Sequence, residues 1–81
     1  MIIRVQLFAA AREQAGRDAI EIELPDGSRV ADLREALVEA LPELTPSIGQ
    51  MVFAVAEQYA SEQTPLTAGT EVACIPPVSG G

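Results

Sequence analysis

Hydrophobic and polar residues alternate in two stretches near the start of the chain, residues 2–8 (IIRVQLF) and residues 19–24 (AIEIEL). A period of two sends successive side chains to opposite faces of an extended backbone, so each stretch is predicted to be a β-strand with one buried face. Between them, residues 9–16 (AAAREQAG) are strong helix formers followed by glycine. They predict a short helix closed by Gly16.

The spacing of apolar residues changes after PDGS at residues 25–28, a sequence typical of turns. Apolar residues now recur three and four positions apart: Val30, Leu33, Ala36, Leu37, Ala40 and Leu41. This predicts an amphipathic helix with Arg34, Glu35 and Glu39 on its opposite side. Ser28 is the expected N-cap, and Pro42 should end the helix.

The second half of the chain predicts three more strands. Residues 50–56 form an apolar strand after a loop over 43–49, and a very short strand follows near Tyr59-Ala60. The last strand covers residues 71–75. One long helix across a mixed sheet of about five strands buries one face of each, so we predict a ubiquitin-like β-grasp domain over residues 1–75. A ferredoxin-like fold would need two comparable helices, and the first predicted helix is too short.

Composition narrows the chemistry that this chain can perform. Its 81 residues fit a single domain. They include one cysteine and no histidine, and all five basic residues are arginine, so the chain has no lysine. A single cysteine excludes an internal disulfide and suits a reducing, cytoplasmic location. Without histidine the chain lacks the commonest general base and metal ligand, so we expect no metal site and no bound cofactor. The net charge of −7 disfavours nucleic acid and anionic membranes and favours a basic protein partner.

The face of the sheet opposite the helix is predicted to be unusually apolar. Phe8, Ala73 and Ile75 have the parity opposite to the core, and the third strand is apolar at both parities, with Met51 and Phe53 set against Val52, Ala54 and Val55. A face open to water should alternate with polar residues, so this pattern indicates a protein interface. The alternative is that the loop over 43–49 covers part of it. Cys74 has core parity, and Glu21 and Glu23 fit a solvated strand face.

The end of the chain, CIPPVSGG, suggests an extended arm. Pro76 and Pro77 fix φ and offer no N–H group, so they should stop the last strand and direct a flexible tail over residues 76–81 outward. Val78, Ser79, Gly80 and Gly81 are small enough to enter a narrow channel. The terminal carboxylate would be an acyl donor only after acquiring a leaving group, such as the phosphate of an acyl-adenylate.

The whole chain resembles the small subunits of molybdopterin synthase, the sulfur carriers of molybdenum-cofactor biosynthesis. The resemblance rests on VQLFAAARE followed by AG, LPDGSRVADLREAL, TPLTAGTEVA and above all the final PPVSGG. Two positions depart from the family pattern. Ile75 stands where an aromatic residue is common, and Arg29 stands where threonine often caps the helix.

The resemblance implies a role for each part of the tail. An ATP-dependent E1-like enzyme adenylates Gly81, and sulfur from a sulfurtransferase converts it to a thiocarboxylate. Pro76, Pro77, Val78, Ser79 and Gly80 carry Gly81 into the large subunit, which holds the catalytic side chains. There the sulfur passes to cyclic pyranopterin monophosphate and builds the dithiolene of molybdopterin. The family complex contains two large and two small subunits, and its hydrophobic contacts map onto Leu7, Phe8, Ala73 and Ile75.

Other functions fit the same sequence. A carrier of this kind could serve thiamine synthesis, cysteine synthesis or tRNA thiolation. A ubiquitin-like modifier would instead be joined through Gly81 to lysines of other proteins. The simplest alternative is a binding module whose final glycines have no role.

Overall fold

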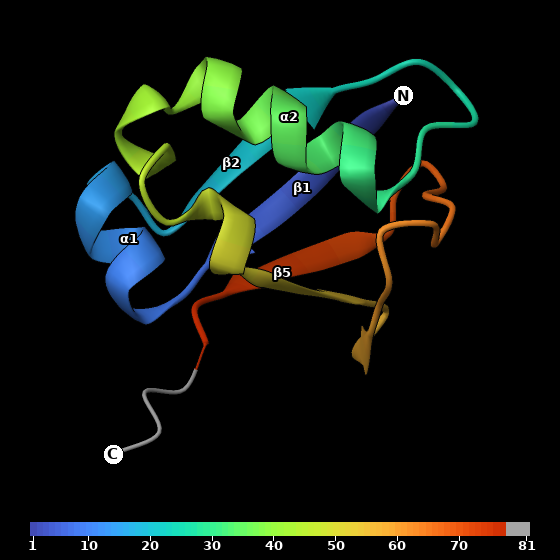
Figure 1. The fold of residues 1–81 in the computed structure, drawn as a ribbon. Coiled ribbons are helices and arrows are strands. Elements are labelled where there is room, and N and C mark those ends of the chain that lie inside the picture. The colour runs from blue at the N-terminus through green and yellow to red at the C-terminus, as the bar shows by residue number, and fades with distance from the viewer. Residues whose placement is uncertain (78–81) are drawn as a thin grey trace.

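The computed structural model describes residues 1–77 of the chain, and the predicted residues Val78, Ser79, Gly80 and Gly81 lie outside the described part. A five-stranded sheet carries one long helix across one face (Figure 1). The elements in chain order are β1 (Ile2–Leu7), α1 (Ala9–Ala15), β2 (Ala19–Glu23), α2 (Val30–Ala40), the 3₁₀ turns η1 (Pro42–Leu44) and η2 (Ile48–Gln50), β3 (Val52–Val55), β4 (Gln58–Tyr59) and β5 (Glu71–Ile75).

The strands follow the order β2-β1-β5-β3-β4 across the sheet. The first and last strands, β1 and β5, are parallel neighbours at its centre, and the other pairs are antiparallel. This mixed sheet with α2 against it is the β-grasp arrangement that the sequence predicts. Gly16 ends α1 in the left-handed conformation, with φ of 72°, as its position predicts.

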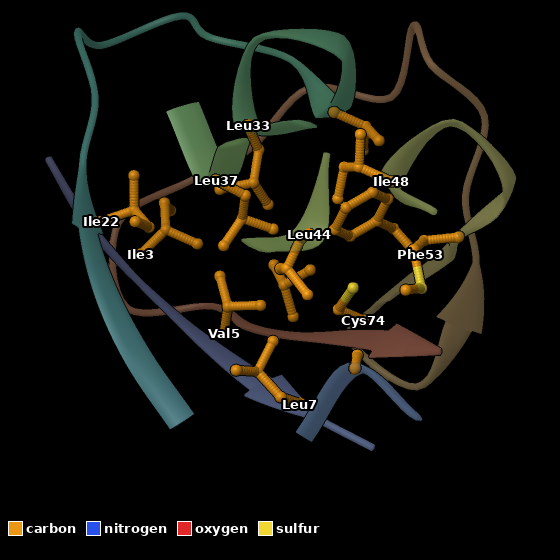
Figure 2. Close-up of a cluster of buried hydrophobic side chains, with 14 of the residues drawn as sticks. Ile3, Val5, Leu7, Ile22, Leu33, Leu37, Leu44, Ile48, Phe53 and Cys74 are labelled. Atoms are coloured by element: carbon orange, nitrogen blue, oxygen red, sulfur yellow. The ribbon is translucent and has the colours of Figure 1, made fainter. Parts of the chain in front are cut away.

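The core lies between α2 and the inner face of the sheet (Figure 2). Alternate residues of β1 (Ile3, Val5 and Leu7) are buried, as the period-two pattern predicts. Leu33 and Leu37 of α2 cover them and are fully buried. Each such side chain contributes about 1.5–3 kcal/mol when it leaves water, so the matched periodicities of sheet and helix supply most of the driving force for this fold.

The segment after α2 differs from the predicted loop. Pro42 begins η1, and η2 follows four residues later, so the chain turns twice in 3₁₀ geometry before β3. Leu44 and Ile48 point into the core and are buried, which explains the compact path (Figure 2). The segment therefore packs on the helix side of the sheet, and the alternative that the loop over 43–49 covers part of the opposite face is wrong.

The start of α2 also differs from the prediction. Arg29, not Ser28, is the N-cap residue, and its backbone N–H donates to the Asp32 carboxylate at 2.8 Å. Ser28 is buried and its hydroxyl donates to the Pro25 carbonyl oxygen at 2.8 Å. The serine is therefore used to close the preceding turn, and Asp32 supplies the capping interaction from within the helix.

Candidate functional site

Strand β5 separates the core from the opposite face of the sheet. Val72 and Cys74 point inward and are buried, whereas Ala73 and Ile75 point outward and are partly exposed. The predicted core position of Cys74 is confirmed, since its side chain has no exposed surface. Burial raises the pKa of the Cys74 thiol to about 11, and the nearby Arg34 charge offsets this only in part. At neutral pH the thiol is protonated and enclosed, so it is no nucleophile.

Apolar side chains gather on the outward side of β5 and β3. The strand register places Val52 opposite Ile75, Ala54 opposite Ala73, and Tyr59 opposite Ala54. Phe8 follows β1 beside them, and its N–H donates to the Cys74 carbonyl oxygen at 3.2 Å. We call this surface the outer apolar face; it consists of Phe8, Val52, Ala54, Tyr59, Ala73 and Ile75.

Three members of the outer apolar face are large and open to solvent. Phe8 is 42% exposed, Val52 37% and Tyr59 79%. The other half of the same side of the sheet is mainly polar, because β1 and β2 place Arg4, Glu21 and Glu23 there, with Arg4 directly opposite Glu21. Ile2, 47% exposed and opposite Glu23, is an isolated large apolar side chain at the far end of this half. Apolar side chains are therefore contiguous only around β3, β4 and β5, the part of the sheet next to the C-terminal segment, and a contiguous exposed apolar patch indicates an interaction surface.

The structure brings together three of the four predicted contact residues: Phe8, Ala73 and Ile75. Leu7 is a correction. Its side chain is only 2% exposed and belongs to the core, because the alternation that turns Phe8 outward turns Leu7 inward. Val55 is a smaller correction: it has the inward parity of Phe53, pairs with buried Val72 and packs against the core.

The two prolines lie where the sequence places them, directly after β5. The strand ends at Ile75, and its last register pair is with Val52. Pro76 and Pro77 then line a shallow apolar hollow together with Val52, Tyr59 and Ile75. We call it the proline hollow. The outer apolar face therefore continues without a polar break onto the base of the predicted tail.

Tyr59 is the residue of this face that the sequence prediction missed. It lies in the two-residue strand β4, opposite outward-facing Ala54. The chain has no other tyrosine and no tryptophan. The signal in the sequence that could have indicated an interface residue is therefore this single tyrosine, in a short strand that follows the apolar third strand. Tyrosine is enriched at protein interfaces because its ring is apolar and its hydroxyl remains hydrated.

Little else in residues 1–77 offers chemistry. In this described part, no three His, Cys, Asp or Glu side chains are grouped so as to hold a metal ion, and no helix is long and apolar enough to cross a membrane. Glu21 and Glu23 lie on the exposed side of β2. The outer apolar face, continuing onto the prolines, is accordingly the best-developed candidate site.

Solved structures with the same fold define the class of protein. Small archaeal modifier protein 1 from Haloferax volcanii matches with a TM-score of 0.88 and 28% identity over the whole of both chains. A putative molybdopterin converting factor, subunit 1, from Pyrococcus furiosus matches at 0.86 and 32%, over 96% of this chain and 99% of that one. The fold of this chain is therefore the ubiquitin-like β-grasp fold of these small proteins.

Sequence comparisons give the family. Residues 5–81 match the model of the ThiS family. Molybdopterin synthase sulfur carrier subunits are similar over nearly their full length: that of Chlamydomonas reinhardtii is 41% identical, with both chains fully covered, and that of Escherichia coli K12 is 37% identical, over 99% of this chain and all of the other. The chain belongs to the ThiS family.

Proposed function

We propose that this chain is a sulfur carrier and serves as the small subunit of a molybdopterin synthase. The observation that carries the proposal is the similarity, over nearly the whole chain, to subunits with that name in a green alga and a bacterium. The outer apolar face supports it, since a carrier must bind other proteins close to its reactive end.

The chemistry would take place at the carboxyl group of Gly81. Attack of this carboxylate on the α-phosphate of ATP forms an acyl-adenylate and releases pyrophosphate, in an E1-like activating enzyme. A persulfide sulfur from a sulfurtransferase then attacks the acyl carbon and displaces AMP; reductive cleavage of the resulting S–S bond by a thiol leaves the thiocarboxylate. This chain supplies no catalytic side chain in the scheme, which fits the absence of histidine and lysine and the buried, protonated Cys74.

The rest of the chain would position that carboxyl group. The outer apolar face binds the large subunit, and Pro76 and Pro77 start an arm of restricted φ that runs through Val78, Ser79 and Gly80 into the large subunit's active site. There the sulfur is transferred to cyclic pyranopterin monophosphate. Two large and two small subunits would form the working complex.

Mass spectrometry of the intact protein tests the sulfur-carrier function. After incubation with ATP, the activating enzyme and a sulfur donor, the chain should exchange one oxygen atom for one sulfur atom. A chain lacking Gly81 should show no exchange, whereas Glu23→Gln, on the polar half of the sheet, should behave as the wild type. Wild-type protein that gains no sulfur under conditions in which a known carrier does would refute the proposal.

Reconstitution with the large subunit and the pterin precursor then tests the pathway. The thiocarboxylated chain should support molybdopterin formation, and the chain lacking Gly81 should not. A thiocarboxylated chain that fails here while supplying sulfur for thiamine synthesis, cysteine synthesis or tRNA thiolation would assign it to one of those pathways instead.

A second candidate is a protein modifier joined through Gly81 to lysines of other proteins. It is favoured by the likeness to small archaeal modifier protein 1. This function predicts high-mass conjugates, visible with an antibody against the chain, that disappear when Gly81 is deleted. Their absence from cells that express both the chain and its activating enzyme would argue against it.

A further inference from the structure

The outer apolar face contains a second hollow at its other end, away from the prolines. It is open, about 630 Å³ in volume, with the small side chains of Ala54 and Ala73 exposed within it and Phe8 beside them. Glu57, in the turn between β3 and β4, and Glu71, the first residue of β5, also line it. We call it the alanine hollow.

Neither carboxylate of the alanine hollow forms an ion pair within residues 1–77, although Arg4 of β1 lies next to Glu71 in the strand register. The ion pairs of this described part join Met1 to Asp26, Arg12 to Asp18 and Arg34 to Glu62, and no arginine lines the hollow. Glu71 accepts a hydrogen bond from the Gln6 amide at 3.1 Å, which fixes the carboxylate beside the hollow without neutralising it. An apolar surface between two such carboxylates is complementary to a side chain with an apolar stem and a positive end.

We propose that the alanine hollow receives an arginine or lysine side chain of the protein that binds the outer apolar face. The methylene stem lies over Ala54 and Ala73, and the cation meets Glu57 and Glu71. A wholly apolar side chain would remove these carboxylates from water with no compensating charge, which is unfavourable. The proposal rests on the proposed function in one respect: the partner is taken to be the protein that receives the Gly81 carboxyl group.

The position of the hollow gives this contact a role in orientation. Glu71 and Ile75 mark the two ends of β5, about 13 Å apart at strand spacing, and the chain leaves the sheet after Ile75. A partner held only at the proline hollow could pivot about the arm. A second, charged contact at the other end of β5 would fix the angle at which the arm enters the partner.

Calorimetric titration of the full-length chain with the large subunit tests the contact. Glu57→Gln combined with Glu71→Gln keeps the shape of the hollow and removes its two charges. We expect about tenfold weaker binding and a weaker dependence of affinity on salt. The control is Glu21→Gln combined with Glu23→Gln, which removes two charges from the polar half of the sheet and should change affinity by less than about twofold. Equal effects of the two double variants would overturn the proposal.

A double-mutant cycle would identify the partner residue. Each exposed arginine or lysine of the large subunit's binding surface is changed to alanine and tested against both the wild-type chain and the Glu57→Gln, Glu71→Gln variant. One residue should show a coupling that the others lack. If every residue gives additive effects, no cation occupies the hollow.

A probe without any partner separates this proposal from the proposed function. Butylguanidinium copies the stem and head of arginine, and on the order of 10 mM should suffice for binding by so small a molecule. It should shift the amide resonances of Ala54, Ala73 and Glu71 in the wild-type chain and not in the Glu57→Gln, Glu71→Gln variant. If the shifts are selective but the chain never gains sulfur in the mass-spectrometric test, the cation-binding role of the alanine hollow is supported and the carrier function is refuted. Shifts that are absent, or equal in the wild type and the variant, would refute the proposal that the alanine hollow binds a cationic side chain, whether or not the chain is a sulfur carrier.

Discussion

Arg34 shows how much one side chain can do in a domain of this size. Its guanidinium donates to both carboxylate oxygens of Glu62, at 2.9 and 2.6 Å, and to the backbone carbonyl oxygens of Ile48 and Met51. It also lies 4.8 Å from the centre of the Phe53 ring. One residue of α2 thus connects the helix to η2, to the start of β3 and to the loop before β5. The helical pattern alone predicts Arg34 on the solvent side.

Replacing Arg34 should destabilise the fold measurably. Arg34→Leu leaves two partly buried carbonyl oxygens without this donor and removes the contact with Phe53, so we expect a loss of about 1–3 kcal/mol in the free energy of unfolding. Arg34→Lys should recover only part of this free energy, because an ammonium group cannot donate two parallel hydrogen bonds to the two carboxylate oxygens of Glu62. Urea denaturation measures both. Arg12→Leu is the matched control: its 3.9 Å pair with Asp18 is exposed, so stability should change little.

Glu62 should make stability depend on pH in the acid range. The hydrogen bonds from Arg34 hold the pKa of the Glu62 carboxyl below its usual value of 4.5; slight burial opposes this, and the charge of Arg34 supports it. The unfolded chain therefore binds a proton at Glu62 more readily than the folded chain. The resulting stabilisation is complete above about pH 4.5 and is lost as the pH falls through the lower, folded value.

Urea denaturation of the wild type and of Glu62→Gln at several pH values checks this expectation. The difference in unfolding free energy should be largest near neutral pH and should shrink as the pH falls below 4.5. Glu39→Gln is the control, because Glu39 belongs to α2, as Arg34 does, and has no ion pair among the described residues. A difference that is independent of pH would show that the Glu62 charge has no role in stability.

At the scale of elements, the β3–β4 hairpin is closed by an unusual pair of turn residues. Val55 and Gln58 are the last register pair, and both residues between them have positive φ, 51° for Ala56 and 68° for Glu57. A two-residue turn of this kind is type I′, which favours Asn-Gly because side chains other than those of Gly, Asn and Asp are strained there. The hairpin therefore stores strain at one edge of the sheet, beside the alanine hollow.

Relieving that strain should stabilise the protein. Ala56→Gly removes a left-handed conformation that costs alanine about 1–2 kcal/mol and adds backbone entropy to the unfolded chain, for a net gain of about 0.5–1 kcal/mol. The same substitution in the middle of α2, Ala36→Gly, should cost about 1 kcal/mol or more. Thermal unfolding of the two variants should shift in opposite directions. A loss of stability at position 56 would show that the turn does not strain alanine.

Elements whose pattern is local were predictable from the sequence. The alternation in β1 and the three-and-four spacing in α2 each report one buried face, and both faces are where the pattern puts them. The η1 and η2 turns were not predictable in this way, because their form depends on burying Leu44 and Ile48 against elements far away in sequence. The helical pattern also misses the contacts of Arg34, because its partners come from other elements.

The alternation of side chains along a strand also decides which residues of the candidate site can be predicted from the sequence. It correctly placed Phe8, Ala73 and Ile75 on one surface, because strand alternation needs no knowledge of the neighbours. It also excludes Leu7, which the family resemblance pairs with Phe8, because adjacent residues of a strand face opposite ways. The two hollows could not be predicted, since each is formed by residues that only the strand register brings together.

At the scale of the whole molecule, β5 separates two tasks. Its inward side chains complete the core of a domain with little stability to spare, and its outward side chains form the surface that the proposed function needs. The acidic residues behind the net charge of −7 are unevenly distributed over the outer side of the sheet. Those of β2 lie on the polar half, and the apolar half is bordered by the two carboxylates of the alanine hollow. Binding and folding should therefore respond separately to changes at neighbouring positions.

Two adjacent residues, Cys74 and Ile75, allow that separation to be tested. Ile75→Asp puts a charge on the outer apolar face, where water still reaches it, so the variant should keep a cooperative unfolding transition. It should bind the large subunit at least about tenfold more weakly, because the carboxylate would lose water at an apolar contact. Cys74→Asp puts the same carboxylate into a position with no exposed surface, at a cost comparable with the total stability of a small domain, so this variant should not fold.

Circular dichroism during urea denaturation and calorimetric titration with the large subunit measure the two properties separately. Val52→Asp, opposite Ile75 in the register, should repeat the behaviour of Ile75→Asp, because both side chains belong to the same surface. If Ile75→Asp binds like the wild type, the partner docks elsewhere and the interface prediction fails even though the fold stands. If Ile75→Asp unfolds the chain, its side chain belongs to the core, and β5 does not divide folding from binding.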